Sequence, residues 1–300
     1  RISNGVMAKR LYGSRDDLGY KSPMECANVT GVHDGFTLID LVSYNDAHNE
    51  GNCGEFDFVS HPPGWNCGHE GPTKDPRIER TRLKLCRFME TLKFLSRGIP
   101  ILTFKNVILE TQHGNSNNFC RPAREEPVER RLEGFQEQFL DFISRLSALR
   151  HEEMTLRRAT FHPDGQPDVF WYSPLGRRLS IEELGRKRNS CFCVHWAGKD
   201  SGILDHQGLP LLGNDILIMI NPLGVSERVV FPNITSSLEE QVNMNDSCST
   251  KVQKGKWARL FDTDIAAPFD CFECFSPGLL YRLAAQSIAV FRFRNETSLE

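Results

Sequence analysis

Two adjacent residues, His33 and Asp34, bring together an imidazole and a carboxylate, side chains that can do acid–base or electrostatic chemistry. They end a short apolar stretch and precede Gly35, so we expect them at the polar tip where a strand ends. A carboxylate there can stabilise positive charge that develops on a substrate carbon. A histidine–aspartate pair is also a common exposed end of a strand, so the pair alone does not identify a site.

The sequence offers no complete metal site. Cys271 and Cys274 have the spacing of half a zinc site or a redox motif, but neither a second pair nor a His-x-x-x-His pattern follows them. The polar stretches hold other histidines and acidic residues whose spacing matches no metal site, namely His48, His61, His69, His113, Asp46, Glu50 and Glu70. We therefore expect no metal ion, and we expect the ten scattered cysteines to be mostly reduced thiols.

Charge and hydrophobicity narrow the classes of partner. A formal net charge of -3 at pH 7 and a pI near 6.3 provide no basic field to neutralise phosphates, so we expect no nucleic-acid partner. No apolar run approaches the roughly 18 residues of a membrane span, so we expect no membrane partner. The 300 residues, 39% of them hydrophobic, suffice for one large or two medium domains. A neutral polymer or a small molecule fits such a chain best.

The elements around the polar tip follow the order of a parallel sheet. Residues 24–44 predict a strand, the tip and a helix, and residues 45–76 form a long polar loop of the kind that is usually functional. An amphipathic helix follows Pro76, and residues 98–104 then predict a short buried strand. Residues 132–150 predict a second amphipathic helix. Strand, loop, helix and strand indicate a βαβ unit.

After Arg158 the pattern changes to short β-like runs separated by turns, which predicts an antiparallel β-sandwich. The runs cover residues 169–172, 191–196, 216–220, 229–231, 257–261 and 287–293. The polar residues 236–256 indicate a loop inserted into this second domain. We therefore expect two domains, at residues 1–158 and 159–300.

Two motifs carry a resemblance to a known family. Residues 29–50, VTGVHDGFTLIDLVSYNDAHNE, closely resemble the last catalytic-strand motif of bacterial glycogen debranching enzymes and isoamylases of the α-amylase superfamily. Residues 65–72, WNCGHEGP, are similar to the motif that follows it there. The resemblance continues through residues 142–150, 168–172 and 215–221, so it extends across nearly the whole chain. Two long motifs in the same order argue against a chance match.

The resemblance implies the C-terminal part of a (β/α)8 TIM barrel, about strands seven and eight with their helices, followed by the antiparallel β-sandwich domain. It implies a retaining hydrolase of α-1,6 branch points in glycogen or amylopectin that needs no cofactor. In the family, the residue matching Asp34 stabilises the oxocarbenium-like transition state, and the residue matching His33 hydrogen-bonds the sugar. Asn115, in a downstream stretch that still matches, is expected to bind substrate. Trp65 could stack on a sugar ring or could simply anchor its loop.

Two departures from the family bear on activity. The nucleophile and the acid/base carboxylate of retaining glycosidases stand about 5 Å apart, and in the family they come from earlier barrel strands that this chain does not contain. We therefore expect the chain to be inactive alone. At the tip of the eighth strand, Asn106 and Val107 replace the family's acidic pair, which removes charge from the site.

These departures leave alternatives open. One is a non-catalytic, isoamylase-like subunit that binds glucan and associates with homologous active subunits. Another is an incomplete gene product without activity of its own. The expected compartment is the cytosol, with the plastid as the alternative.

Overall fold

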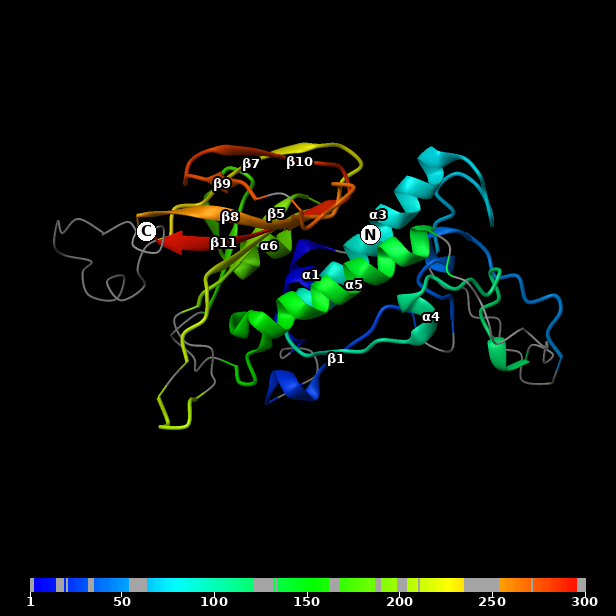
Figure 1. Cartoon of the computed structure of the whole chain (residues 1–300), viewed down its shortest axis with the longest axis horizontal. Coiled ribbons are helices and arrows are strands. Elements are labelled where there is room, and N and C mark those ends of the chain that lie inside the picture. The colour runs from blue at the N-terminus through cyan, green and yellow to red at the C-terminus, as the bar shows by residue number, and fades with distance from the viewer. Residues whose placement is uncertain are drawn as a thin grey trace. The chain divides into compact units, whose positions relative to one another are not determined.

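The computed structural model of the chain divides into two compact units, residues 13–152 and residues 1–12 together with 153–300 (Figure 1). The residues that the structure describes are 3–14, 19, 21–31, 35–53, 64–120, 132, 134–161, 168–186, 190–198, 204–209, 211–234, 254–270 and 272–295. Helix α1 (Asn4–Leu11) belongs to the second of these units. The domain assignment from the sequence, 1–158 and 159–300, stays a prediction. None of the described helices is long and apolar enough to cross a membrane.

The unit 13–152 contains a parallel pair of short strands. Strand β1 (Ala27–Asn28) pairs with β2 (Ile99–Pro100) in parallel, with Ala27 opposite Ile99. Helix α3 (Pro76–Leu95) lies between them in the chain, and the Asp75 carboxylate caps it by accepting from the Arg77 backbone N–H at 2.9 Å. Parallel strands separated by a helix confirm the predicted βαβ unit.

The second long helix of this unit, α5 (Gly134–Glu152), packs on α3. Its apolar residues recur at helical spacing and are buried, namely Phe139, Phe142, Ile143, Leu146 and Leu149. From the last turn of α5, Arg150 donates to the carbonyls of Phe94, of Ser96 at 3.1 Å and of Gly98 at 2.6 Å. The guanidinium therefore satisfies carbonyls at the C-terminal end of α3, where the helix dipole favours a cation. Both long helices predicted from the sequence are confirmed.

The buried strand predicted at residues 98–104 is wrong in extent and burial. Only the two residues of β2 are strand, and Ile101 and Leu102 are 40% and 44% exposed. Among the described residues β2 pairs with β1 alone, so the side chains that follow it have no second sheet neighbour to cover them. The chain then turns into the short helix α4 (Phe104–Val107).

The helix expected at the end of residues 24–44 is a single 3₁₀ turn, η2 (Asp40–Val42). The Ser43 N–H closes this turn by donating to the Asp40 carbonyl at 3.0 Å, and the Tyr44 N–H donates to the same carbonyl at 3.0 Å. The next N–H, of Asn45, donates to the Glu70 carboxylate at 3.0 Å, so the helix cannot continue. Two further 3₁₀ turns belong to this unit, η1 (Pro23–Glu25) and η3 (Asn118–Cys120).

A seven-stranded antiparallel sheet forms most of the second unit, in the order β4-β3-β5-β6-β11-β8-β9. Its strands are β3 (Val169–Tyr172), β4 (Arg178–Leu179), β5 (Phe192–Trp196), β6 (Ile216–Asn221), β8 (Gly255–Asp262), β9 (Cys274–Phe275) and β11 (Ser287–Asn295). A separate antiparallel pair joins β7 (Glu227–Val230) to β10 (Leu280–Leu283). All six predicted β-like runs therefore correspond to strands, and their antiparallel pairing is confirmed.

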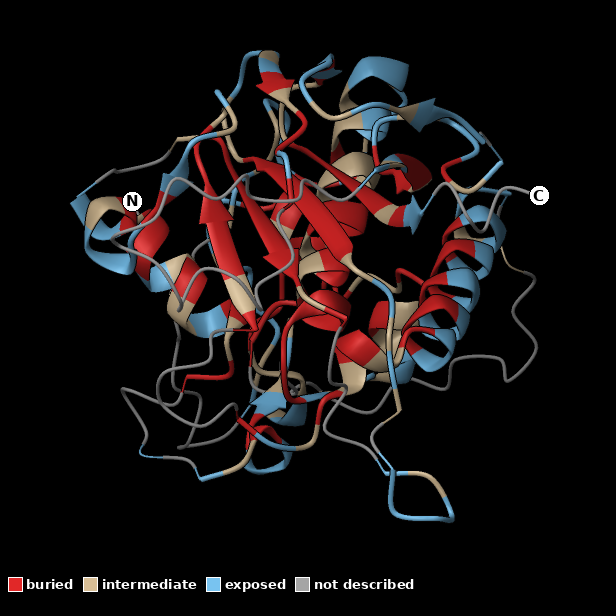
Figure 2. Ribbon diagram, turned by 90° about the vertical axis from the view of Figure 1, so that its left-hand side faces the viewer, coloured by how far each residue is buried: buried red, intermediate tan, exposed pale blue. Residues whose placement is uncertain are grey.

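One apolar core joins the two sheets of this unit. Leu217, Met219 and Phe291 from the larger sheet belong to the same buried cluster as Val229 and Leu283 from the β7–β10 pair. The central strands are buried along their whole length, as the red ribbons of Figure 2 show. Burial on both faces explains why these strands are continuous apolar runs and do not alternate. The loop predicted at residues 236–256 lies almost entirely outside the described residues.

Two short helical segments complete the second unit. Helix α6 (Ile181–Arg186) packs against α1, where a Cβ at Gly5 would lie only 2.6 Å from the Gly185 Cα. This close approach requires a residue without a side chain on α1. The Asn4 side chain adds a hydrogen bond of 2.7 Å to the Ser190 hydroxyl. The 3₁₀ turn η4 (Met154–Arg157) follows α5 in the chain.

Candidate functional site

The four residues expected to do chemistry or bind substrate all belong to the unit 13–152. His33 and Asp34 follow β1 in the chain, and both lie outside the described residues. The structure describes three polar segments of the same unit. We call them the first loop (residues 44–53), the second loop (residues 64–71) and the third loop (residues 111–118). Trp65 is in the second loop and Asn115 in the third.

Asparagine side chains join the first loop to the third. The Asn49 Oδ1 accepts from the Ser116 backbone N–H at 2.9 Å, and the Asn52 Nδ2 donates to the Asn117 carbonyl at 3.1 Å. Asn115 is 5% exposed, and its Nδ2 donates to the Asn52 Oδ1 at 2.6 Å. In this structure Asn115 thus holds the two loops together. Its expected contact with substrate stays a prediction.

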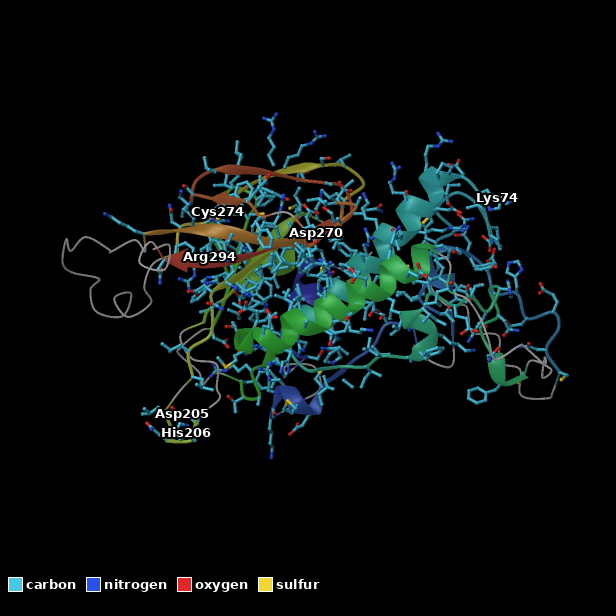
Figure 3. All side chains as sticks on the ribbon, viewed as in Figure 1. Lys74, Asp205, His206, Asp270, Cys274 and Arg294 are labelled. Carbon is cyan, nitrogen blue, oxygen red and sulfur yellow. The ribbon has the colours of Figure 1, made fainter. Side chains whose placement is uncertain are left out.

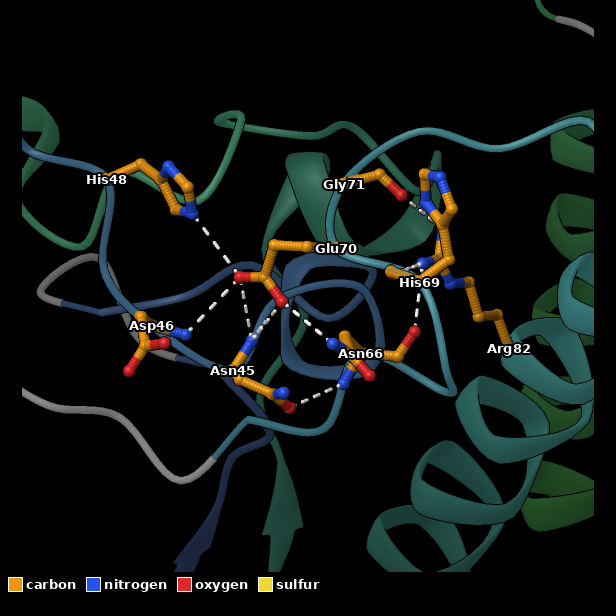
Figure 4. A network of polar contacts seen from close by, with 8 residues as sticks. All are labelled: Asn45, Asp46, His48, Asn66, His69, Glu70, Gly71 and Arg82. Carbon is orange, nitrogen blue, oxygen red and sulfur yellow. Dashed lines mark hydrogen bonds and ion pairs between the residues drawn. The ribbon is translucent and has the colours of Figure 1, made fainter.

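Glu70 organises the second loop and joins it to the first (Figure 4). Its carboxylate accepts from the Asn45 backbone N–H at 3.0 Å, from the Asn66 Nδ2 at 2.9 Å, and from the Asp46 backbone N–H at 3.4 Å. The His48 Nε2 lies 3.3 Å from the same carboxylate. Partial desolvation raises the pKa of Glu70, but these hydrogen bonds outweigh it and hold the pKa below its usual value.

Arg82 reaches from α3 into the second loop (Figure 4). Its guanidinium donates to the carbonyl of Gly71 at 2.8 Å, to that of Asn66 at 3.0 Å, and to that of His69. The side chain is nearly fully buried, at 6% exposure. A planar group with five donors can bind several carbonyls at once. The guanidinium therefore fixes the positions of three carbonyls of the second loop relative to one another.

The backbone of Trp65 is hydrogen-bonded to a residue outside its own loop. Its backbone N–H donates to the Leu41 carbonyl at 2.9 Å, and the side chain is 48% exposed. Arg82 and Glu70 fix the loop without using the indole ring. The two roles considered from the sequence, stacking on a sugar ring and anchoring the loop, both stay predictions.

Asp40 is a site residue that the sequence analysis missed. It is fully buried, and its carboxylate accepts from the Thr111 hydroxyl and from the Gln112 backbone N–H at 2.7 Å. Burial raises the pKa of Asp40, although these hydrogen bonds partly offset the effect. The carboxylate thereby fixes the start of the third loop. A signal was present, since an acidic residue within the apolar stretch LIDLV needs partners elsewhere in the fold.

Asn106, which stands at one of the family's acidic positions, lies in α4 and is 4% exposed. Its Oδ1 accepts from the Leu38 backbone N–H at 2.9 Å. Its Nδ2 donates to the carbonyl of Thr30 at 2.5 Å and to that of Gly31 at 3.3 Å. Both ends of the amide are therefore engaged with the main chain on either side of the segment that carries His33 and Asp34.

The described residues contain no group of three or more histidine, cysteine or acidic side chains that could hold a metal ion. Cys274 lies on the edge strand β9 and is exposed (Figure 3). Cys271, the other cysteine of this closely spaced pair, lies outside the described part of the chain, as does His61. The described cysteines are all free.

Sequence comparison finds relatives named as isoamylases and glycogen debranching enzymes, although no protein-family model matches the chain. The glycogen operon protein GlgX homolog of Mycobacterium tuberculosis is 34% identical over 241 residues, which are 76% of this chain and 33% of the relative. Isoamylase 3, chloroplastic, of Oryza sativa subsp. japonica is 32% identical over 293 residues, 94% of this chain and 32% of the relative. A glycogen debranching enzyme of Pectobacterium carotovorum is 31% identical over 61% of this chain and 28% of its own length. The chain thus spans about a third of the length of the curated relatives it matches.

Comparison with solved structures finds a fold that two pullulanases share. A pullulanase from Bacillus acidopullulyticus superposes with a TM-score of 0.55 and 16% identity, covering 96% of this chain and 26% of that chain. A pullulanase from Anoxybacillus sp. LM18-11, solved with maltotetraose, gives a TM-score of 0.53 and 15% identity over 95% of this chain and 30% of that chain. At this identity the likeness shows that the fold is shared.

Proposed function

We propose, from the premise that this chain is a homologue of the isoamylases and glycogen debranching enzymes, that it is part of a glycoside hydrolase that cleaves α-1,6 branch points of glycogen or starch. The observation that carries the proposal is the similarity to a chloroplastic isoamylase over 94% of the chain. Because the relatives are about three times as long as the matched region, we propose the activity for a protein that contains this chain.

We propose that β1 and β2 are the last two strands of a (β/α)8 barrel and that the second unit is a β-sandwich. In such barrels the site is built at the C-terminal ends of the strands. The parallel pairing of β1 with β2 supports this placement, because His33 and Asp34 follow the end of β1 and Asn106 follows the end of β2. The buried apolar core between the two sheets of the second unit supports the sandwich.

In this proposal Asp34 stabilises the transition state, because a carboxylate helps most where positive charge develops on the anomeric carbon. His33 hydrogen-bonds a sugar hydroxyl, Trp65 stacks on a sugar face, and Asn115 contributes to the substrate-binding surface. The nucleophile and the acid/base carboxylate belong to earlier barrel strands. The protein works without a cofactor, in the cytosol or, alternatively, in a plastid.

The direct test is the release of reducing ends by the product of the longest open reading frame that contains this chain. Amylopectin, glycogen and linear amylose serve as parallel substrates. We expect release from the two branched polymers only, with the new reducing end initially in the α configuration, as retention requires. Release from linear amylose at a comparable rate, or an initial β product, would refute a retaining debranching activity.

The replacement of the acidic pair by Asn106 and Val107 favours a second candidate, a non-catalytic subunit that binds glucan and associates with homologous isoamylases. This candidate predicts retarded migration in gels that contain amylopectin, with no release of reducing ends. It also predicts co-elution with an active isoamylase in gel filtration. Release of reducing ends by the purified protein alone would exclude it.

A further inference from the structure

The amide of Asn106 connects two parts of the main chain that flank one short segment. On one side are the carbonyls of Thr30 and Gly31, at 2.5 and 3.3 Å from the Nδ2, and on the other is the N–H of Leu38, at 2.9 Å from the Oδ1. His33 and Asp34 lie between these flanks in the sequence. The hydrogen bonds therefore fix how far apart the two ends of this segment stand.

The chemistry of the contacts selects an amide at this position. The flank before the segment presents only carbonyl acceptors, and the flank after it presents an N–H donor. An asparagine side chain both donates and accepts, whereas an ionised aspartate can only accept. A carboxylate at position 106 would place a negative oxygen against two carbonyl oxygens in a site that is 4% exposed, so the neutral amide fits and the acid does not.

The surroundings of Thr30 and Gly31 hold the first flank in place. The Thr30 hydroxyl bonds to Glu90 of α3, and Glu90 pairs with Lys93 at 2.5 Å, with both side chains at most 2% exposed. Gly31 has a φ of +67°, and a Cβ added there would lie 3.2 Å from the Asn106 Nδ2. A side chain at Gly31 would be strained and would crowd the amide, so the close approach depends on glycine. Thr30 is thus hydrogen-bonded to α3, and Asn106 connects Thr30 and Gly31 to Leu38.

We propose that Asn106 is a positioning residue that sets the separation of Gly31 and Leu38 and through it acts on the segment of the sequence that carries His33 and Asp34. The effect of Asn106 on catalysis rests on the proposed function. The loss of the family's charge at this position then marks a different way of holding the segment.

The test is the stability of an Asn106→Asp variant as a function of pH, in the longest open reading frame that contains the chain. A protonated aspartic acid can still donate to one carbonyl, but the carboxylate cannot. The folded-state pKa of the new acid is therefore raised, so its stability is present below the ordinary Asp pKa of about 3.9 and is lost as pH rises through the folded pKa. We expect the melting temperature to fall roughly 5 °C below that of the wild type at neutral pH and to approach it near pH 4. An Asn295→Asp variant, with the same charge change at an exposed residue, is the control.

Parallel melting curves of Asn106→Asp and the wild type across this pH range would overturn the proposal. If the variant does not fold, Asn106→Ser replaces it, because an uncharged hydroxyl cannot bridge both flanks. We then expect hydrogen exchange of the Leu38 amide to accelerate about tenfold or more. Unchanged exchange at Leu38 would also overturn the proposal.

The catalytic arm separates this inference from the proposed function. In an active protein we expect Asn106→Asp to lower kcat on amylopectin by roughly tenfold to a hundredfold at neutral pH, with partial recovery at lower pH. A pH-dependent loss of stability with kcat and KM unchanged would refute the positioning role. If the wild type neither binds nor cleaves glucan, the proposed function fails, and the pH dependence of melting still tests whether Asn106 links the flanks.

Discussion

Replacing Arg82 with methionine removes the guanidinium that three carbonyls of the second loop share. Methionine keeps an apolar stem of similar length, so the main change is the loss of donors from a side chain that is 6% exposed. Hydrogen bonds from a charged donor contribute about 1.5–3 kcal/mol each, and neighbouring bonds do not add fully. The carbonyls can partly rehydrate, so we expect loop opening to become easier by roughly 3 kcal/mol.

Hydrogen exchange measures this change directly. The Trp65 N–H donates to Leu41 at 2.9 Å, and the Gly71 N–H donates to Ser43 at 2.8 Å, so both amides report on opening of the second loop. A loss of roughly 3 kcal/mol corresponds to exchange about a hundredfold faster at both.

Two further variants serve as comparisons. Arg82→Lys keeps the charge without the planar fork and should fall between the wild type and Arg82→Met. Arg80→Met, at an exposed position on the same helix, should leave exchange nearly unchanged. Equal protection of Trp65 and Gly71 in Arg82→Met and the wild type would refute the view that the second loop is held by this cation.

Three more predictions follow from the same unit. Because burial raises the pKa of Asp40, the free energy of unfolding of the wild type should exceed that of Asp40→Asn by most below the ordinary Asp pKa. This difference should disappear as the pH rises through the folded-state pKa, and urea unfolding at about pH 4 and pH 7 would measure it. Gly114→Ala should cost about 1–3 kcal/mol in urea unfolding, because φ is +75° and the new Cβ would lie 2.7 Å from the Tyr44 ring; an unchanged midpoint would contradict this. Arg150→Met should lower the free energy of unfolding by roughly 3 kcal/mol, because it removes the guanidinium that donates to the Phe94, Ser96 and Gly98 carbonyls. A change below about 0.5 kcal/mol in urea unfolding would show that water replaces the guanidinium as donor.

The regular elements were predictable because the spacing of apolar residues in the local sequence indicates which side chains are buried. The helix over Pro76–Leu95 has apolar residues at helical spacing and a proline at its first position. The strand over Ile216–Asn221 is a continuous apolar run because it is buried on both faces. The extent of β2 was not predictable, since residues 98–104 are apolar enough for a buried strand and only the absence of a second described sheet neighbour leaves them exposed.

The candidate site was only partly predictable, because its key contacts join distant parts of the chain. Asp40 bonds to Thr111 and Gln112, about seventy residues away, and no local pattern reveals that pairing. Asn106 could be recognised from the sequence only as a lost charge. Its three hydrogen bonds to residues 30, 31 and 38 show that the amide connects two parts of the main chain. Motif similarity pointed to His33, Asp34 and the loops, but not to the side chains that hold the described loops together.

The measurement that tests the central claim most directly is the rate of reducing-end release from amylopectin by an Asp34→Asn variant of the longest open reading frame that contains this chain. An Asp46→Asn variant, with the same change at an exposed residue of the first loop, is the matched control. If Asp34 stabilises the transition state, its variant should be slower by at least about a hundredfold while the control stays within a factor of about two. An Asp34→Asn enzyme as fast as the control would contradict the assignment of Asp34 to the chemistry of branch-point hydrolysis.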